Sequence, residues 1–138
     1  TSRLAYHLAR EEARAARADE TLLVSPAGEV LEGAVSNVFA VTGGEVLTPP
    51  LASGILPGIT RAVVLGLCAA AGIPARESTL TLADLRAADE EFLTNTVQEI
   101  VPVGTLQDLA IPGRSIAATL LTAYRAEVTM EAGRVHGG

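Results

Sequence analysis

Residues 36–48, SNVFAVTGGEVLT, restrict the fold most strongly, because they predict a β-hairpin. Two runs rich in β-branched and aromatic residues flank Gly43 and Gly44. Paired glycines between two such runs are typical of the tight turn that joins antiparallel strands. The chain is therefore expected to contain antiparallel strands.

Helical segments alternate with strands along the rest of the chain. The apolar run AVVLGLCAAAG predicts a helix over residues 60–71, which Gly72 and Pro74 end. Thr81 and Asp84 have the spacing of a capping box and predict a short helix. Further helices are predicted over residues 2–17 and 114–128, and further extended segments over residues 21–25, 29–33, 75–80, 90–95 and 99–103. We therefore expect one α+β unit with antiparallel or mixed strands.

Composition and charge limit the kinds of partner. The chain has 138 residues, of which 49% are apolar, so it is long enough for one domain with its own core. A net charge of −6 argues against nucleic acid or an anionic membrane, because both need a concentrated basic surface. No stretch is apolar for long enough to span a membrane, and no targeting peptide is visible. We expect a cytoplasmic protein that binds a small molecule or another protein.

Residue types exclude several kinds of catalytic site. One cysteine and two distant histidines cannot form a metal cluster, and Cys68 lies in an apolar helical run, where a core residue is expected. All ten basic residues are arginines, so this chain cannot supply an amine nucleophile or a P-loop lysine. Glu90 and Glu91 are neighbours in a predicted strand and should face opposite sides, which argues against a paired acid and base.

Two stretches are candidates for binding an anion. GILPGITR, residues 54–61, enters a helix through a glycine, so the first amides of the helix and the Thr60 hydroxyl can surround a phosphate. FLTNTVQE, residues 92–99, places Thr94, Asn95 and Thr96 where a strand ends. The alternatives are an ordinary helix start and a polar turn that bonds only to itself. Two donor clusters directed at one phosphate would be a specific arrangement.

A third stretch, LEGAVSNVF, residues 31–39, contains a candidate buried carboxylate. Glu32 lies between apolar residues and beside Gly33, so it needs a cationic or hydrogen-bonding partner. That partner is either an arginine of the fold or a protonated ring nitrogen of a ligand. Asn37 in the same stretch is expected to support backbone groups at a turn or strand end.

Three segments that include these stretches follow one another along the chain: LEGAVSNVF, TPPLASGILPGITR and ADEEFLTNTVQEIVPV. In this order and at these separations they resemble the class IV (fold type IV) aminotransferase family of pyridoxal-phosphate enzymes. Its members include branched-chain and D-amino-acid aminotransferases and 4-amino-4-deoxychorismate lyase. The resemblance implies the family's C-terminal, cofactor-binding domain over residues 1–130, a barrel-like mixed sheet with flanking helices. A flexible tail is expected over residues 131–138.

The resemblance also implies roles for individual residues. Glu32 would hold the pyridine nitrogen of pyridoxal 5'-phosphate in its protonated form, and Leu56 would pack against the ring. Ile59 and Thr60 would give a backbone and a hydroxyl donor to the phosphate. Asn95, through its backbone, and Thr96 would close the other side of the phosphate, while Asn37 and Arg61 would support these loops.

Two parts of the family's active site are expected outside this chain. The lysine that forms a Schiff base with the cofactor should fall about two residues upstream of Thr1, and the family's N-terminal domain is absent. The resemblance therefore implies a fragment that is inactive alone, from an enzyme expected to form a homodimer.

The choice among family members depends on fewer residues. VSNVF and LTNTVQEIVPV look closest to 4-amino-4-deoxychorismate lyase, and Asn95 is the most telling residue. That enzyme would release pyruvate from aminodeoxychorismate and leave 4-aminobenzoate for folate synthesis. A D-amino-acid or branched-chain aminotransferase is the alternative. A noncatalytic domain that binds a phosphorylated ligand is a further alternative.

Overall fold

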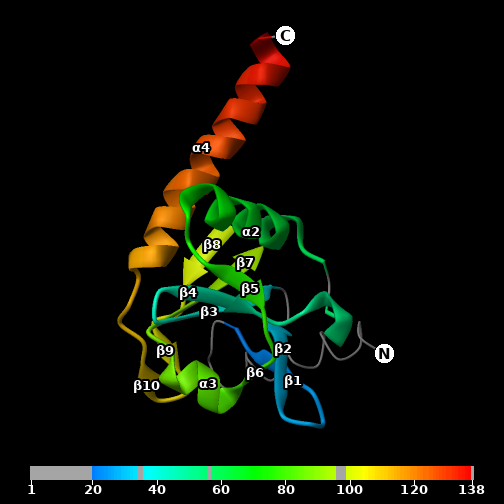
Figure 1. Cartoon of the computed structure of the whole chain (residues 1–138), viewed down its shortest axis with the longest axis vertical. Helices are drawn as coiled ribbons and strands as arrows, with labels where there is room; N and C mark the ends of the chain where they lie inside the picture. Colours follow the sequence, from blue (N-terminus) through cyan, green and yellow to red (C-terminus); the bar gives the residue numbers. More distant parts are fainter. Residues whose placement is uncertain (1–19, 34–35, 56, 96–98, 138) are drawn as a thin grey trace.

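The computed structural model describes residues 20–33, 36–55, 57–95 and 99–137, so the helix predicted over residues 2–17 lies outside the described residues. A five-stranded sheet forms the centre of the molecule (Figure 1). Its strands, in spatial order, are β5 (Ala75–Glu77), β4 (Glu45–Thr48), β3 (Asn37–Thr42), β7 (Glu90–Asn95) and β8 (Glu99–Pro102). Only the β4–β5 pair is parallel within the described sheet, so it is mixed, as predicted.

Two smaller sheets complete the described strands. One contains β1 (Leu22–Val24), β2 (Glu29–Gly33) and β6 (Leu80–Thr81), and the other contains β9 (Thr105–Leu106) and β10 (Leu109–Ala110). The predicted mixed sheet with flanking helices is confirmed, but these strands do not close into a barrel. The reason is that β2 pairs with β1 and β6 and not with a strand of the five-stranded sheet.

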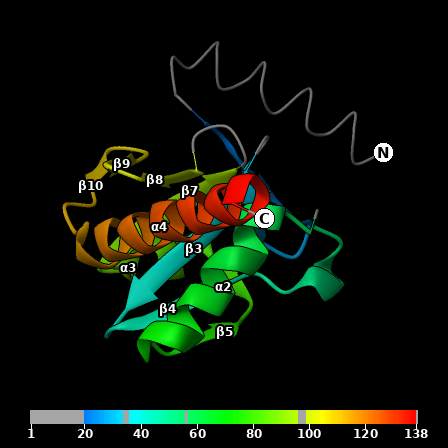
Figure 2. The same ribbon diagram turned by 90° about the horizontal axis from the view of Figure 1, so that it is seen from above.

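Helices cover one face of the large sheet. The described helices are α2 (Ile59–Ala71), α3 (Leu82–Ala87) and α4 (Ser115–Gly137), with a short 3-10 turn η1 (Leu51–Ser53). Figure 2 shows α2 and α4 lying over the sheet, where Val64 and Leu120 pack against Phe39 and Phe92. These two rings stack with their centroids 4.8 Å apart. The opposite face packs against β2, β6 and α3 through a second apolar cluster: Val30, Val38, Ala40, Leu80 and Leu85.

Most local predictions are confirmed. The hairpin turns at Gly43 and Gly44, both with positive φ, and α2 ends at Gly72 in the left-handed conformation. The Thr81–Asp84 capping box begins α3, and Cys68 is a buried core residue.

The end of the last helix differs from its prediction. We expected it near Val128, but α4 continues to Gly137 and extends beyond the sheet (Figure 1). Alanine, glutamate and methionine in this segment favour helix, and no proline interrupts it. The flexibility expected of residues 131–138 stays a prediction.

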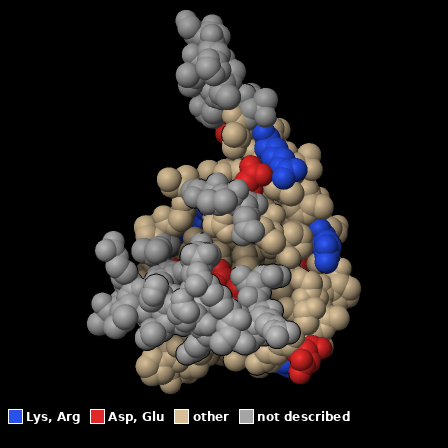
Figure 3. Space-filling view, turned by 180° about the vertical axis from the view of Figure 1, so that it is seen from behind, with Lys and Arg blue, Asp and Glu red and all other residues tan. Residues whose placement is uncertain are grey.

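Charged side chains are scattered on the one face of the molecule that Figure 3 shows. On the face in Figure 3, the described basic and acidic residues form small separate groups on a mostly uncharged surface. None of the described helices combines the length and the apolar character that a membrane crossing requires.

Candidate functional site

Helix α2 begins without a side-chain cap. Its N-cap is Gly58 (φ −61°, ψ 139°), and the first turn contains no acidic residue. The first backbone bond of the helix runs from the Ala62 amide to the Gly58 carbonyl (3.2 Å). By helix geometry, the amides of Ile59, Thr60 and Arg61 therefore have no carbonyl partner within the helix. The positive end of this helix dipole lacks a neighbouring carboxylate from its own first turn.

The other described α-helices are capped by acidic side chains. Asp84 completes the capping box of α3. The Glu90 carboxylate accepts hydrogen bonds from the amides of Ile116 (3.0 and 3.1 Å) and Ala117 (3.2 Å) at the start of α4. Because the same chain places carboxylates at two helix starts and none in the first turn of α2, this start is suited to an external anion.

Thr60 adds a buried donor to this helix start. The residue is 1% exposed, and its Oγ1 atom has no hydrogen-bond partner within the described part of the chain. A buried hydroxyl without a partner costs roughly 1–3 kcal/mol. An oxygen of a bound anion would remove that cost, so the donor set of this helix start fits a phosphate group.

Thr94 lies on the sheet face that carries α2. It pairs with Asn37 across β3 and β7, two residues along from the stacked pair of Phe39 and Phe92. Alternation along the strands puts these four side chains on the helical side of the sheet. Thr94 is buried, and its Oγ1 atom also has no partner among the residues described. The structure thus places a second buried hydroxyl on the side of the sheet where α2 begins.

Asn37 connects this region of the sheet to the helix start. A Cβ atom added to Gly58 would overlap the Asn37 side-chain oxygen, so the two residues are in direct contact. Sequence reasoning expected Asn37 to support a loop but did not identify Gly58 as the residue against it. The close contact explains why position 58 has no side chain, although its backbone angles would admit one.

Glu32 lies near the end of β2, and it is buried, as predicted. The next residue, Gly33, donates its amide to the carbonyl of Ser36 (2.8 Å), directly before Asn37. The Ser36 hydroxyl in turn donates to Glu20 (3.0 Å). These contacts fix the end of the strand that carries Glu32 to the start of β3, the strand that contacts Gly58 through Asn37.

The remaining predicted site residues divide into two groups. Asn95 ends β7 and pairs with Glu99. The Ile59 side chain is 73% exposed, so the backbone amide of Ile59 is the group available at the helix start. Leu56 and Thr96 lie outside the described residues. The structure thus brings Thr60, Asn37 and Thr94 to one region, and the cofactor-binding roles of all the predicted site residues stay predictions.

Arg61 supports the loop before α2, as expected. Its Nη2 atom donates to the Pro49 carbonyl (3.1 Å) and to the Glu77 carboxylate (2.7 Å). The Leu51 amide and the Arg61 guanidinium both donate to this carboxylate and lower its pKa. Sequence reasoning missed Glu77, although the need of a buried arginine for a carboxylate could have prompted a search for one.

Comparison with known proteins gives the family context. Residues 1–106 match the sequence profile described as "Amino-transferase class IV". A candidate branched-chain-amino-acid aminotransferase from Methanocaldococcus jannaschii is 43% identical over 109 residues, which are 79% of this chain and 38% of that protein.

Solved structures agree with the sequence match. A branched-chain amino acid aminotransferase from Escherichia coli has a TM-score of 0.85 and 33% identity over 88% of this chain and 42% of its own. A candidate 4-amino-4-deoxychorismate lyase from Legionella pneumophila has a TM-score of 0.85 and 30% identity over 90% of this chain and 47% of its own. The chain therefore spans less than half the length of these relatives.

Proposed function

Because the chain belongs to the class IV aminotransferase family, we propose that it forms the cofactor-binding part of a pyridoxal-phosphate enzyme. Enzymes of this family use pyridoxal phosphate. The observation that carries the proposal is the uncapped start of α2 together with the buried, unpartnered Thr60 hydroxyl in the described structure. We assign this helix start to the phosphate of the cofactor.

The assignment gives each phosphate donor a defined role. The amides of Ile59 and Thr60 and the Thr60 hydroxyl donate to phosphate oxygens from the helix side. The Asn95 backbone, at the end of β7, and Thr96 would donate to the same phosphate. A doubly charged phosphate also interacts favourably with the positive end of the α2 dipole. This end of the site provides binding and orientation.

Glu32 and Leu56 act on the ring of the cofactor. When bound, the pyridine ring supplies an electron sink for bonds broken at the carbon next to the substrate's amino group. The Glu32 carboxylate accepts a hydrogen bond from the ring nitrogen and keeps its proton in place. Burial of Glu32 strengthens this interaction, because there is little water to screen it. Leu56 would pack against a face of the ring.

Transamination of an amino acid is our first candidate reaction. The observation in its favour is that relatives such as the Methanocaldococcus jannaschii protein are named as branched-chain aminotransferases. The second candidate is the release of pyruvate from 4-amino-4-deoxychorismate. Asn95 and the likeness to the Legionella pneumophila protein favour this lyase activity.

The phosphate assignment is tested by Thr60→Val, which removes the hydroxyl at nearly constant volume. Binding of pyridoxamine 5'-phosphate to the protein at its native length should weaken about 10- to 100-fold, the effect of losing one hydrogen bond to a charged group. Thr119→Val, at an exposed threonine on α4, is the matched control and should bind like wild type. Unchanged affinity of Thr60→Val would refute the assignment.

The reaction is tested by supplying both kinds of substrate. Glutamate formed from 2-oxoglutarate and a branched-chain amino acid would establish the transaminase. Pyruvate and 4-aminobenzoate formed from 4-amino-4-deoxychorismate would establish the lyase. If the protein binds pyridoxamine 5'-phosphate but forms neither product, the result would favour a noncatalytic binding domain.

A further inference from the structure

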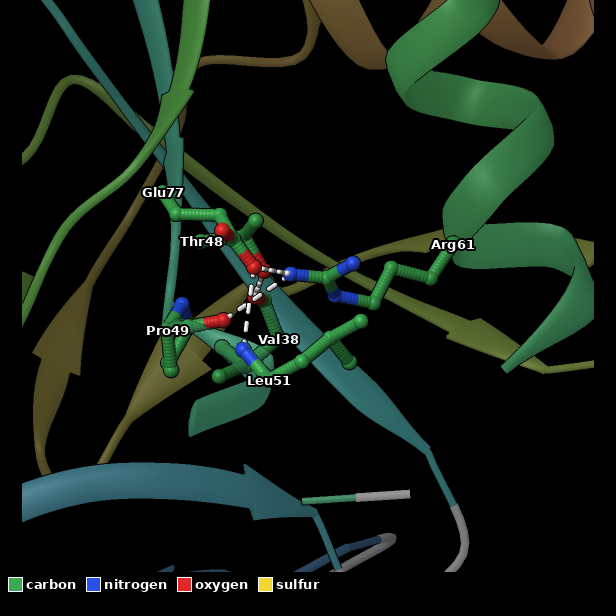
Figure 4. Close-up of polar contacts among 6 residues, drawn as sticks. All are labelled: Val38, Thr48, Pro49, Leu51, Arg61 and Glu77. Carbon is green, nitrogen blue, oxygen red and sulfur yellow. Dashed lines mark hydrogen bonds and ion pairs between the residues drawn. The ribbon is translucent and has the colours of Figure 1, made fainter. Parts of the chain in front are cut away.

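One carboxylate oxygen joins the start of α2 to the loop that leads into it. Glu77 Oε2 accepts a hydrogen bond from Arg61 Nη2 (2.7 Å) and another from the Leu51 amide (2.9 Å) (Figure 4). Arg61 lies in the first turn of α2, next to Thr60, whereas Leu51 begins η1. Glu77 itself lies at the end of β5, away from both segments in the sequence. A residue outside the proposed phosphate site is thus bonded both to the first turn of α2, which contributes to that site, and to the loop that leads into it.

The Arg61 guanidinium depends on this contact. Arg61 is 4% exposed, and its Nε atom has no hydrogen-bond partner in the described part of the structure. A buried cation requires nearby negative charge or strong acceptors. Among the described residues its acceptors are the Pro49 carbonyl and the Glu77 carboxylate, and of these only Glu77 carries charge. Without Glu77, the buried Arg61 guanidinium would lack a charged partner. The Arg61 side chain should then shift and displace the first turn of α2.

The origin of the loop is fixed by separate contacts. The Thr48 hydroxyl donates a hydrogen bond to the Val38 carbonyl (2.7 Å). The Thr48 carbonyl accepts a hydrogen bond from the Ser78 amide (2.9 Å). The loop therefore leaves β4 at a defined point, and its direction is next set at Leu51 by Glu77 (Figure 4). At its far end Gly58 lies against Asn37. Glu77 joins Leu51, near the start of this connection, to Arg61 in the helix that follows.

From these contacts we infer that Glu77 is a positioning residue for the phosphate-binding end of α2, acting through Arg61 and the Leu51 amide. This inference rests on the proposed function of that helix start. Glu77 is 45% exposed and lines an open groove of about 440 Å³ together with Leu51 and Arg61. Removing its side chain therefore enlarges a groove that is already open to solvent, and does not create a closed cavity in the core.

The test compares two probes that share the phosphate. Binding of pyridoxamine 5'-phosphate, and its competition by inorganic phosphate, are measured on the protein at its native length. We expect Glu77→Ala to weaken both probes by the same factor, about tenfold, because the loss lies in the phosphate part of the site. Glu77→Gln keeps a neutral acceptor and should lie between Glu77→Ala and wild type. If circular dichroism shows that Glu77→Ala is unfolded, the test uses Glu77→Gln, whose smaller loss of affinity should again be equal for the two probes.

The matched control is Glu45→Ala. It removes the exposed ion pair between Glu45 and Arg76 (3.0 Å), which joins the neighbouring strands β4 and β5. This variant should bind both probes like wild type. The inference is overturned if the Glu77 variants bind like wild type, or if they lose pyridoxamine 5'-phosphate without an equal loss of inorganic phosphate. Failure of the wild-type protein to bind either probe would instead refute the proposed function.

Discussion

Gly58 lies so close to Asn37 that a Cβ atom at position 58 would overlap the Asn37 side-chain oxygen. The backbone angles of Gly58 (φ −61°, ψ 139°) are open to any residue, so only space forbids a side chain here. Gly58→Ala should therefore destabilise the protein by about 1–3 kcal/mol, since Asn37 or the start of α2 must move. It should also weaken binding of pyridoxamine 5'-phosphate. Urea unfolding and ligand titration measure the two effects.

A second glycine in the same helix provides the control. Gly66 is exposed, and a Cβ atom added there meets nothing within 4 Å. Gly66→Ala should stabilise the protein by about 0.5–1 kcal/mol, because alanine is the better helix former. The two positions differ as N-cap and helix interior, and alanine is the poorer N-cap, so a loss at position 58 larger than that of an N-cap alanine measures the contact with Asn37. The same sign for both would show that this contact does not restrict position 58.

Glu90 should stabilise α4 from outside the helix. Its buried carboxylate accepts the Ile116 and Ala117 amides, which otherwise lack partners at the helix start. Glu90→Ala should lower the free energy of unfolding by about 1–2 kcal/mol, as for the loss of a helix cap. Glu127→Ala, at an exposed position of α4, should change it by less than about 0.5 kcal/mol. Equal effects of the two variants in urea unfolding would contradict the capping role.

Sequence reasoning succeeded where the structural signal is local. The glycines of the hairpin, the capping box at Thr81 and the glycine that ends α2 each act on residues a few positions away. The cap that Glu90 provides for α4 could not be predicted in this way. It joins residues 26 positions apart, so it exists only once β7 and α4 have packed.

The candidate site shows the same limit. The stretch GILPGITR predicted a helix start suited to an anion, and the α2 N-terminus lies there without a side-chain cap. The residues that hold it in place were harder to find, because Arg61 and Glu77 are 16 positions apart and meet only through the pairing of β4 with β5. The expected mixed sheet was found, but that the described strands do not close into a barrel could not be predicted, since strand character does not determine which strands pair.

Glu32 should affect turnover more than cofactor binding. In the protein at its native length, Glu32→Gln should keep its affinity for pyridoxamine 5'-phosphate but lose roughly 100-fold in kcat, since a neutral amide holds the ring proton poorly. The control is Glu29→Gln, at the other end of the same strand, which should turn over like wild type. Unchanged turnover in Glu32→Gln would remove its assigned role.

Glu91 should make the stability of the protein depend on pH. It is 2% exposed, and neither carboxylate oxygen has a hydrogen-bond partner among the described residues. It pairs with Ala40 on the sheet face that packs against Val30 and Leu80. Burial raises the pKa of this carboxyl to about 7, from an ordinary value of 4.5. The folded protein therefore keeps a proton that the unfolded chain releases between these two values.

The sign of the effect follows from this difference. Below about pH 4.5 both states are protonated, so Glu91 imposes no charge penalty. As the pH rises toward about 7 the unfolded state is increasingly favoured, and above this value the loss levels off at roughly 3 kcal/mol. Glu91→Leu should abolish this fall and be more stable than wild type at about pH 8, by the same amount. Urea unfolding of both proteins from about pH 5 to 8 measures the difference, and parallel stability curves would show that Glu91 does not titrate in this range.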